Sequence, residues 1–182
     1  MPLRLILVAT VALVAGLGAA VAAIALVGGE ESPRPGPSES VRDEPVSGPP
    51  VTLSGTDVRT GEAIALRRLA DQPVVIAVWA SWCGACVRQA HAFERFVSSH
   101  AQVSVLAVDT QEDAAAAQAF LESTGLELPT VADTEGQLAA RLGVRELPTT
   151  LFLAQDHRVA SMWEGTAGLA DLNAGLQIAR RG

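Results

Sequence analysis

The sequence predicts an α/β domain in which helices alternate with the strands of one sheet. Apolar and β-branched stretches suited to buried strands alternate with stretches whose apolar residues recur at helical spacing. The clearest strand, 74–79, leads directly into Trp82-Cys83-Gly84-Ala85-Cys86, and a helical pattern follows over 87–97. With 182 residues, 49% of them apolar, the chain is long enough for one domain with a core and an appendage.

An uncharged N-terminal segment precedes this domain. From Leu5 to Val27 no residue is charged, and as a helix this run would span about 35 Å, enough to cross a bilayer. Small residues that could form a signal-peptide cleavage site lie inside the run. Residues 1–29 are therefore expected to be an uncleaved signal-anchor, with secretion after cleavage as the alternative. Arg4 before the run and Glu30 after it favour a cytoplasmic N-terminus and an extracytoplasmic domain.

The next segment, 30–50, is rich in proline, serine and glutamate and has few apolar side chains. Such a segment cannot bury enough apolar surface to fold, so we expect a flexible linker that tethers the domain at 51–182 to the membrane. The formal net charge of −7 argues against a nucleic-acid partner.

The domain divides into elements from its N-terminal end onward. Two short apolar segments around a turn-rich stretch predict a hairpin over 51–66, and one helical turn is expected at 67–71 before the central strand. Later strands are expected at 103–108, 128–131, 149–154 and 158–163. Later helices are expected at 112–123, 136–142 and 167–181, the last with an apolar side.

Cys83 and Cys86 are the only cysteines of the chain, and the pattern around them places the pair at the start of a helix. The first turn of a helix has unpaired N–H groups and a partial positive charge, which stabilise a thiolate there. Cys86, one helical turn further on, can close a disulfide with Cys83. The pattern therefore indicates a redox-active pair; an inert pair, a structural disulfide and half of a zinc site are the alternatives.

Two motifs together carry a resemblance to a known family. Trp-Cys-Gly-Ala-Cys after a hydrophobic strand, with Glu146-Leu147-Pro148-Thr149-Thr150 downstream, resembles the thioredoxin superfamily. More narrowly, the chain is similar to the membrane-anchored, extracytoplasmic TlpA/ResA-type (DsbE/CcmG-like) thiol-disulfide oxidoreductases. The resemblance covers the chain from Val51 to its C-terminus. It implies a thioredoxin fold, a central mixed sheet flanked by helices, with an N-terminal hairpin extension and a central strand-helix insert.

The resemblance also implies roles for the residues of both motifs. Cys83 would be the nucleophile and Cys86 the resolving thiol, with exchange running through a mixed disulfide with a partner protein. Pro148 matches the family's cis-proline, which faces the cysteine pair; a trans-proline at the start of an edge strand is the alternative. The remaining expected site residues are Trp82, Gly84 and Ala85, which flank or separate the cysteines, and Leu147 and Thr149, which complete a groove for an extended substrate peptide.

Three positions depart from the family pattern. The buried aspartate of thioredoxin falls on Ala77, a glutamate common in TlpA/ResA-type proteins is replaced by Gln89, and the second residue between the cysteines is Ala85 instead of proline. None of these groups can accept the proton that Cys86 loses when it attacks. We therefore expect water or a carboxylate outside the motif, such as Asp109, to take that role.

The predicted function is thiol-disulfide exchange with protein substrates, without a metal or other cofactor. By resemblance this is disulfide reduction outside the cytoplasm, with apocytochrome c as a candidate substrate in cytochrome c maturation and a membrane thiol relay as electron donor. A thiol oxidase that introduces disulfides is the alternative. A peroxiredoxin is disfavoured by Ala80 and Ile76, which stand where its motif has threonine and proline. A peptide-binding module that does not use its cysteines is a further alternative.

Overall fold

The computed structural model describes residues 41–42 and 48–182. These residues belong to one compact unit, Glu39–Gly182. The predicted signal-anchor at 1–29 and most of the predicted linker at 30–50 lie outside the described residues. Among the residues that are described, no helix is both long and apolar enough to cross a membrane.

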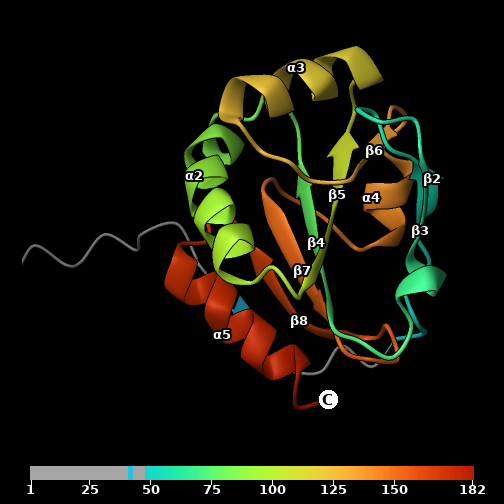
Figure 1. The fold of residues 1–182 in the computed structure, drawn as a ribbon, viewed down its shortest axis with the longest axis vertical. Helices are drawn as coiled ribbons and strands as arrows, with labels where there is room; N and C mark the ends of the chain where they lie inside the picture. Colours follow the sequence, from blue (N-terminus) through green and yellow to red (C-terminus); the bar gives the residue numbers. More distant parts are fainter. Residues whose placement is uncertain (1–40, 43–47) are drawn as a thin grey trace, which may run out of the picture. The chain divides into compact units, whose positions relative to one another are not determined.

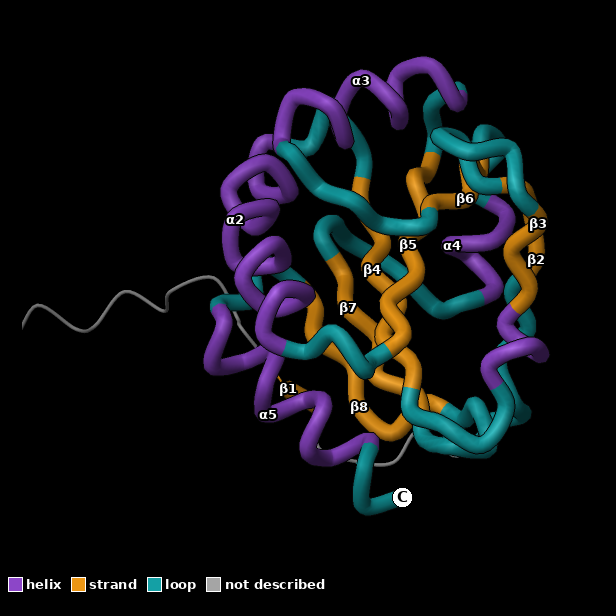
Figure 2. The backbone as a smooth tube through the Cα atoms, viewed as in Figure 1, coloured by secondary structure: helices purple, strands orange, loops and turns teal. Residues whose placement is uncertain are grey.

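The domain is built on a six-stranded mixed sheet in the order β1-β8-β7-β4-β5-β6 (Figures 1 and 2). Its strands are β1 (Val41–Arg42), β4 (Val74–Trp79), β5 (Ser104–Thr110), β6 (Thr130–Asp133), β7 (Thr149–Leu153) and β8 (Val159–Glu164). β4, β5 and β6 are parallel, whereas β7 runs antiparallel to both β4 and β8. β1 comes from the stretch predicted as a linker, and it pairs with the edge of β8.

Helices cover both faces of this sheet, as the resemblance to thioredoxin implied. They are the 3₁₀ turn η1 (Leu66–Leu69) and the helices α2 (Gly84–Ser99), α3 (Ala114–Thr124), α4 (Gln137–Arg141) and α5 (Leu169–Ala179). In Figure 1, α2, α3 and α5 lie on one side of the sheet, and α4 lies on the other with the hairpin of β2 (Ser54–Thr56) and β3 (Ala63–Ala65). The predicted hairpin and the predicted strand-helix insert, β6 with α4, are therefore both present.

β4 separates two hydrophobic cores, because all six of its residues are buried. Val75, Ala77 and Trp79 point into the core beneath α2, α3 and α5, which we call the helix-side core. Their neighbours Val74, Ile76 and Val78 point into the core beneath α4 and the hairpin, the hairpin-side core. Side chains of a strand alternate between the two faces of a sheet, so an unbroken apolar run is what a strand buried on both faces requires.

Two glycines allow unusually close packing at these faces. A Cβ atom on Gly175 would lie 2.3 Å from the Phe152 ring, so α5 rests directly on β7. A Cβ atom on Gly55 would lie 2.4 Å from Cγ1 of Val131, so the hairpin lies directly against β6. Neither position has room for a side chain.

Two helices begin later than the sequence pattern predicts. α3 starts at Ala114 because the side chain of Asp113 caps it, accepting a hydrogen bond from the Ala116 N–H at 2.9 Å. α5 starts at Leu169 because Gly168 is its N-cap, with the Gly168 N–H donating to the side chain of Asp171 at 2.8 Å. Both differences are decided by side-chain contacts that the helical spacing of apolar residues does not report.

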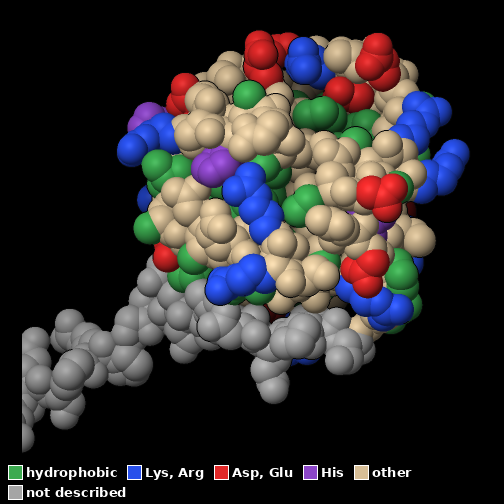
Figure 3. All heavy atoms as spheres, turned by 60° about the horizontal axis from the view of Figure 1, so that its bottom comes forward, with side chains coloured by type: hydrophobic (Ala, Val, Ile, Leu, Met, Phe, Trp, Pro, Cys, Tyr) green, Lys and Arg blue, Asp and Glu red, His purple; other side chains and the backbone are tan. Residues whose placement is uncertain are grey.

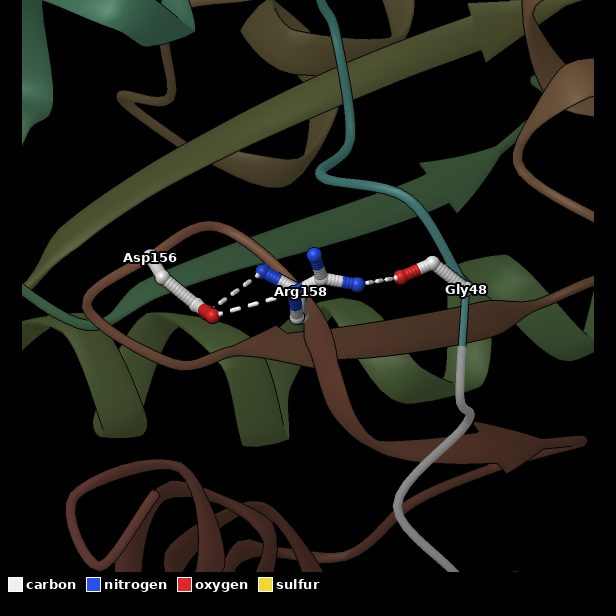
Figure 4. A network of polar contacts seen from close by, with 3 residues as sticks. All are labelled: Gly48, Asp156 and Arg158. Atoms are coloured by element: carbon white, nitrogen blue, oxygen red, sulfur yellow. Dashed lines mark hydrogen bonds and ion pairs between the residues drawn. The ribbon is translucent and has the colours of Figure 1, made fainter.

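The start of the domain is fastened to the turn between β7 and β8 (Figure 4). The Arg158 side chain donates to the backbone carbonyl of Gly48 and also contacts Asp156, with Nε 3.2 Å from Oδ2. Close by, the N–H of Val51 donates to the carbonyl of His157 at 2.9 Å. These contacts hold the entering chain at the end of the sheet far from the cysteines, since β7 ends and β8 begins there.

Candidate active site

Cys83 lies at the junction between β4 and α2, where it is the N-cap residue of the helix. Its Sγ accepts a hydrogen bond from the backbone N–H of Cys86 at 3.1 Å, so one of the unpaired N–H groups of the helix start is aimed at the sulfur. The two cysteines form a disulfide, with their Cα atoms 5.2 Å apart. Hydrogen bonding to sulfur at a helix N-terminus favours a thiolate once this bond is reduced.

Two exposed hydrophobic side chains stand close to the cysteines in the sequence. Two large hydrophobic side chains are strongly exposed among the described residues, Trp82 at 60% and Val87 at 51%, and both stand next to the pair in the sequence. On the face shown in Figure 3, by contrast, acidic and basic side chains are interspersed and hydrophobic ones form separate small patches. Exposed apolar groups at one place on a charged surface are typical of a site that contacts another protein.

A groove of about 550 Å³ opens beside Cys83. One wall is the segment from Trp82 to Ala85, and the opposite wall is formed by α4 and the segment from Val144 to Leu147. Thr110 and Gln111, at the end of β5, line it as well. The groove therefore brings together most of the predicted site residues, including Trp82, Cys83, Gly84, Ala85 and Leu147.

Pro148 faces the buried side of the cysteine pair. The Leu147–Pro148 peptide bond is cis, as the resemblance implied. Pro148 and Cys86 line a common apolar cavity of about 20 Å³ in the helix-side core. The Pro148 carbonyl accepts a hydrogen bond from the N–H of Gly165 at 2.8 Å, which ties the proline to the segment that leads into α5.

Two of the expected site residues line neither the groove nor the cavity that Cys86 shares with Pro148. Thr149 is fully buried, and its hydroxyl donates to the Glu146 carbonyl at 2.7 Å. Asp109 is also fully buried, at the end of β5, and lines neither the groove nor the cavity behind Cys86. The structure thus places Thr149 beneath the groove, where it supports the turn before it.

Asp109 belongs instead to a group of carboxyl side chains beneath the active-site loop. Neither of its oxygens accepts a hydrogen bond from the described residues. The neighbouring Glu112 accepts two hydrogen bonds from Ser81, one from its backbone N–H and one from its hydroxyl. Ser81 precedes Cys83 by two residues, so Glu112 holds the loop that leads into Cys83.

Asp109 and Glu112 have pKa values shifted in opposite directions. Burial raises the pKa of Asp109 to about 9, and the nearby carboxyl groups of Glu112 and Asp113 add to this effect. Partial burial also opposes ionisation of Glu112, but the hydrogen bonds from Asp109 and Ser81 outweigh it, and the pKa of Glu112 is lowered. At neutral pH Asp109 is therefore protonated and able to donate to an ionised Glu112.

Sequence reasoning missed Ser81 and Glu112. The signal that could have found them is topological. β4 and β5 are parallel, so the loops that follow their carboxyl ends lie at the same edge of the sheet. Ser81 follows the last residue of β4, Trp79, by two residues. Glu112 follows Asp109, which pairs with Trp79 on β5, by three residues.

Comparison with known proteins identifies the family. The model of the AhpC/TSA family matches residues 48–162. The chain belongs to this family. Membership of the thioredoxin superfamily, which the two motifs predicted, is thereby confirmed.

Relatives with assigned names are thiol-disulfide oxidoreductases. The chain is 30% identical over 110 residues to thiol-disulfide oxidoreductase ResA of Bacillus subtilis, covering 58% of this chain and 60% of that one. It is 28% identical over 107 residues to ResA of Halalkalibacterium halodurans, covering 58% and 61%. The match thus spans about three fifths of the length of these relatives. A DsbF homologue from Corynebacterium diphtheriae has the same fold, with a TM-score of 0.68, 23% identity and coverage of 79% of this chain and 94% of that one.

The buried carboxyl group makes stability depend on pH in a predictable direction. Between about pH 4 and pH 9 Asp109 is ionised in the unfolded chain but protonated in the folded one, because burial raises its pKa to about 9. The unfolded state therefore binds fewer protons, and the free energy of unfolding falls as pH rises through this window. In Asp109→Asn this contribution disappears, so the fall in unfolding free energy from pH 5 to pH 8, measured by urea denaturation, should be smaller.

Asp71→Asn is the matched control, because Asp71 is exposed and has a positive φ of 64°, a conformation that asparagine also adopts readily. This variant should keep the pH dependence of the natural chain. An equal pH dependence in Asp109→Asn and the natural chain would contradict the assignment of a protonated Asp109.

Proposed function

We propose that this chain is a protein thiol-disulfide oxidoreductase that uses the Cys83–Cys86 pair. The observation that carries the proposal is the position of Cys83: its sulfur caps the first turn of α2 and lines the groove in which a substrate can lie. The disulfide, the cis-proline beside Cys86 and the ResA relatives agree with it. We favour disulfide reduction, the activity that the resemblance to TlpA/ResA-type proteins implies.

Reduction would proceed through two exchanges. The Cys83 thiolate attacks one sulfur of a substrate disulfide, forming a Cys83–substrate disulfide and releasing the other substrate sulfur as a thiolate. Cys86 then loses its proton and attacks Cys83 Sγ, closing the Cys83–Cys86 bond and releasing the second substrate thiolate. The substrate gains two electrons, which the cysteine pair loses, and both released thiolates take up protons from solvent or from the protein. A dithiol protein must then reduce the pair again.

The location and partners follow from the segments before the domain. An uncharged run from Leu5 to Val27 followed by a proline-rich linker suits a domain held outside the cytoplasm by a signal-anchor. Electrons would then come from a membrane protein that relays thiols across the bilayer. Extracytoplasmic proteins with disulfides are the substrate class, and apocytochrome c, whose cysteines must be reduced before haem attachment, is the substrate we favour.

Asp109 is the proton acceptor that we propose for Cys86. The side chain lies on the helix-side face of the sheet, beside Trp79 in the register of β4 and β5. Because burial raises its pKa to about 9, Asp109 is protonated at neutral pH, and only its ionised form, which becomes populated as the pH approaches 9, can take the proton from Cys86. Because Asp109 lines neither cavity beside the cysteines, the proton would have to pass through water or a movement of the loop that Ser81 and Glu112 hold.

Substitution of the two cysteines separates their roles. In Cys86→Ser the second exchange cannot occur, so a mixed disulfide between Cys83 and a substrate protein such as insulin should accumulate and be visible on a non-reducing gel. In Cys83→Ser no such adduct should form and insulin reduction should stop. Adducts formed equally well through Cys86 would overturn the assignment of the nucleophile.

The reduction potential of the pair decides the direction of reaction. Equilibration of the purified full-length chain, in detergent, with dithiothreitol or glutathione should give a value near that of thioredoxin, about −270 mV. A value near −120 mV would make the pair an oxidant. In that case the reductase proposal, and with it the role in cytochrome c maturation, would be wrong.

The role of Asp109 can be tested with the same protein. In Asp109→Asn the second exchange loses its acceptor, so the rate of insulin reduction should fall, and the pH dependence that reflects a group with a pKa of about 9 should disappear. An unchanged pH profile would rule Asp109 out. Asp71→Asn again serves as the control, because its exposed side chain lies outside the site.

A further inference from the structure

We infer that Gln89 is a positioning residue that holds the cysteine helix at a fixed distance from the backbone around Pro148. This inference rests on the proposed function, because it concerns how a substrate peptide and Cys83 are brought together. Gln89 stands where TlpA/ResA-type proteins commonly have a glutamate, and nothing in the proposed mechanism requires it. It is nevertheless 97% buried, with an exposed fraction of 3%.

The amide of Gln89 joins three segments that are far apart in the sequence. It lies on α2, three residues after Cys86. Its Nε2 donates to Oγ1 of Thr150 on β7 at 3.3 Å, and its Oε1 accepts from the N–H of Ala167 at 2.9 Å. A buried amide that is bonded at both ends defines the separation of its partners, since loss of either bond would leave a polar group unpaired in the core.

Both partners of Gln89 belong to segments that hold Pro148. Thr150 follows Pro148 by two residues along β7. Ala167 follows Gly165 by two residues, and Gly165 donates to the Pro148 carbonyl at 2.8 Å. Two segments therefore hold Pro148, and both are hydrogen-bonded to the side chain of Gln89. One turn of helix separates that side chain from Cys86.

This arrangement has a consequence for large substrates. An extended peptide would pair with the backbone of Leu147, next to Pro148, while its disulfide reaches Cys83. Reaction then depends on the spacing between this backbone and the sulfur, because small errors in position slow a bound reactant strongly. A small disulfide without a peptide backbone reaches Cys83 without using Leu147. Gln89 should therefore matter for protein disulfides and hardly at all for small ones.

The test compares two substrates with the reduced full-length chain. In Gln89→Leu, which keeps the size and removes both hydrogen bonds, the second-order rate constant for insulin disulfides should fall about tenfold. The rate constant for 5,5′-dithiobis(2-nitrobenzoate), an aromatic disulfide, should change by less than about twofold, because its access to Cys83 is unaltered. Gln118→Leu is the matched control: Gln118 is an exposed glutamine on α3, and both rates should stay unchanged.

Two further variants check the mechanism. Gln89→Glu keeps the acceptor for Ala167 and lets the Thr150 hydroxyl bond to the new carboxyl group. It is tested in the Cys86→Ser background, where no proton has to leave Cys86, and there it should form the insulin adduct as fast as the chain with Gln89. Thr150→Val removes one of the two bonds with little change of shape, so its insulin rate should fall less than that of Gln89→Leu. Combining Thr150→Val with Gln89→Leu should add nothing, because the same link has already been broken.

Each outcome bears on the inference. Equal falls for both substrates, or an unchanged insulin rate in Gln89→Leu, would overturn it. If Gln89→Leu does not fold, Thr150→Val decides: equal effects of this variant on the two substrates would refute the positioning role. If the natural chain reacts with the aromatic disulfide but fails to reduce insulin, the proposed function itself is wrong, which is a different result from a loss confined to the Gln89 variants.

Discussion

Burial of β4 on both faces is the constraint on which the other parts of the site depend. The strand pairs with β5 on one side and β7 on the other, and its alternating side chains fill two separate cores. A shift of its register by one residue would turn each apolar set toward the wrong layer. The same register places Thr149 opposite Val78 and Asp109 opposite Trp79, so the proline segment and the carboxyl group both arrive at the end of the strand from which Cys83 follows.

Two sets of polar contacts fix the segments on either side of the cysteine pair. Glu112 holds Ser81 in the loop before Cys83, and Gln89 links the helix after it to β7 and to the start of α5. Buried polar groups are costly unless they are paired, so such contacts favour one arrangement of the segments they join. Asp109 accepts no hydrogen bond from the described residues, and by remaining protonated it avoids the larger cost of a buried charge.

The two sulfur atoms occupy different surroundings, which suits an ordered pair of exchanges. Cys83 lines an open groove and receives a hydrogen bond at the start of α2, as a nucleophile that must meet another protein requires. Cys86 does not line that groove, and with Pro148 it lines a small apolar cavity. Exposed Trp82 adds apolar contact area to the groove. These surroundings agree with the proposed order of exchanges, in which substrate meets Cys83 first and Cys86 acts from within the domain.

Local patterns in the sequence were sufficient to predict the α/β class, the order of the elements after β1 and the cysteine pair at a helix start. These features can be read from short stretches, because strand and helix spacing repeat every few residues and the motif around Cys83 is eight residues long. The cis bond at Pro148 came from resemblance alone. The positions of Thr149, Glu112 and Gln89 were decided only by tertiary structure. Gln89 lies 78 residues from Ala167, and Ser81 lies 31 from Glu112, so these bonds exist only once strand register and helix docking have brought the segments together.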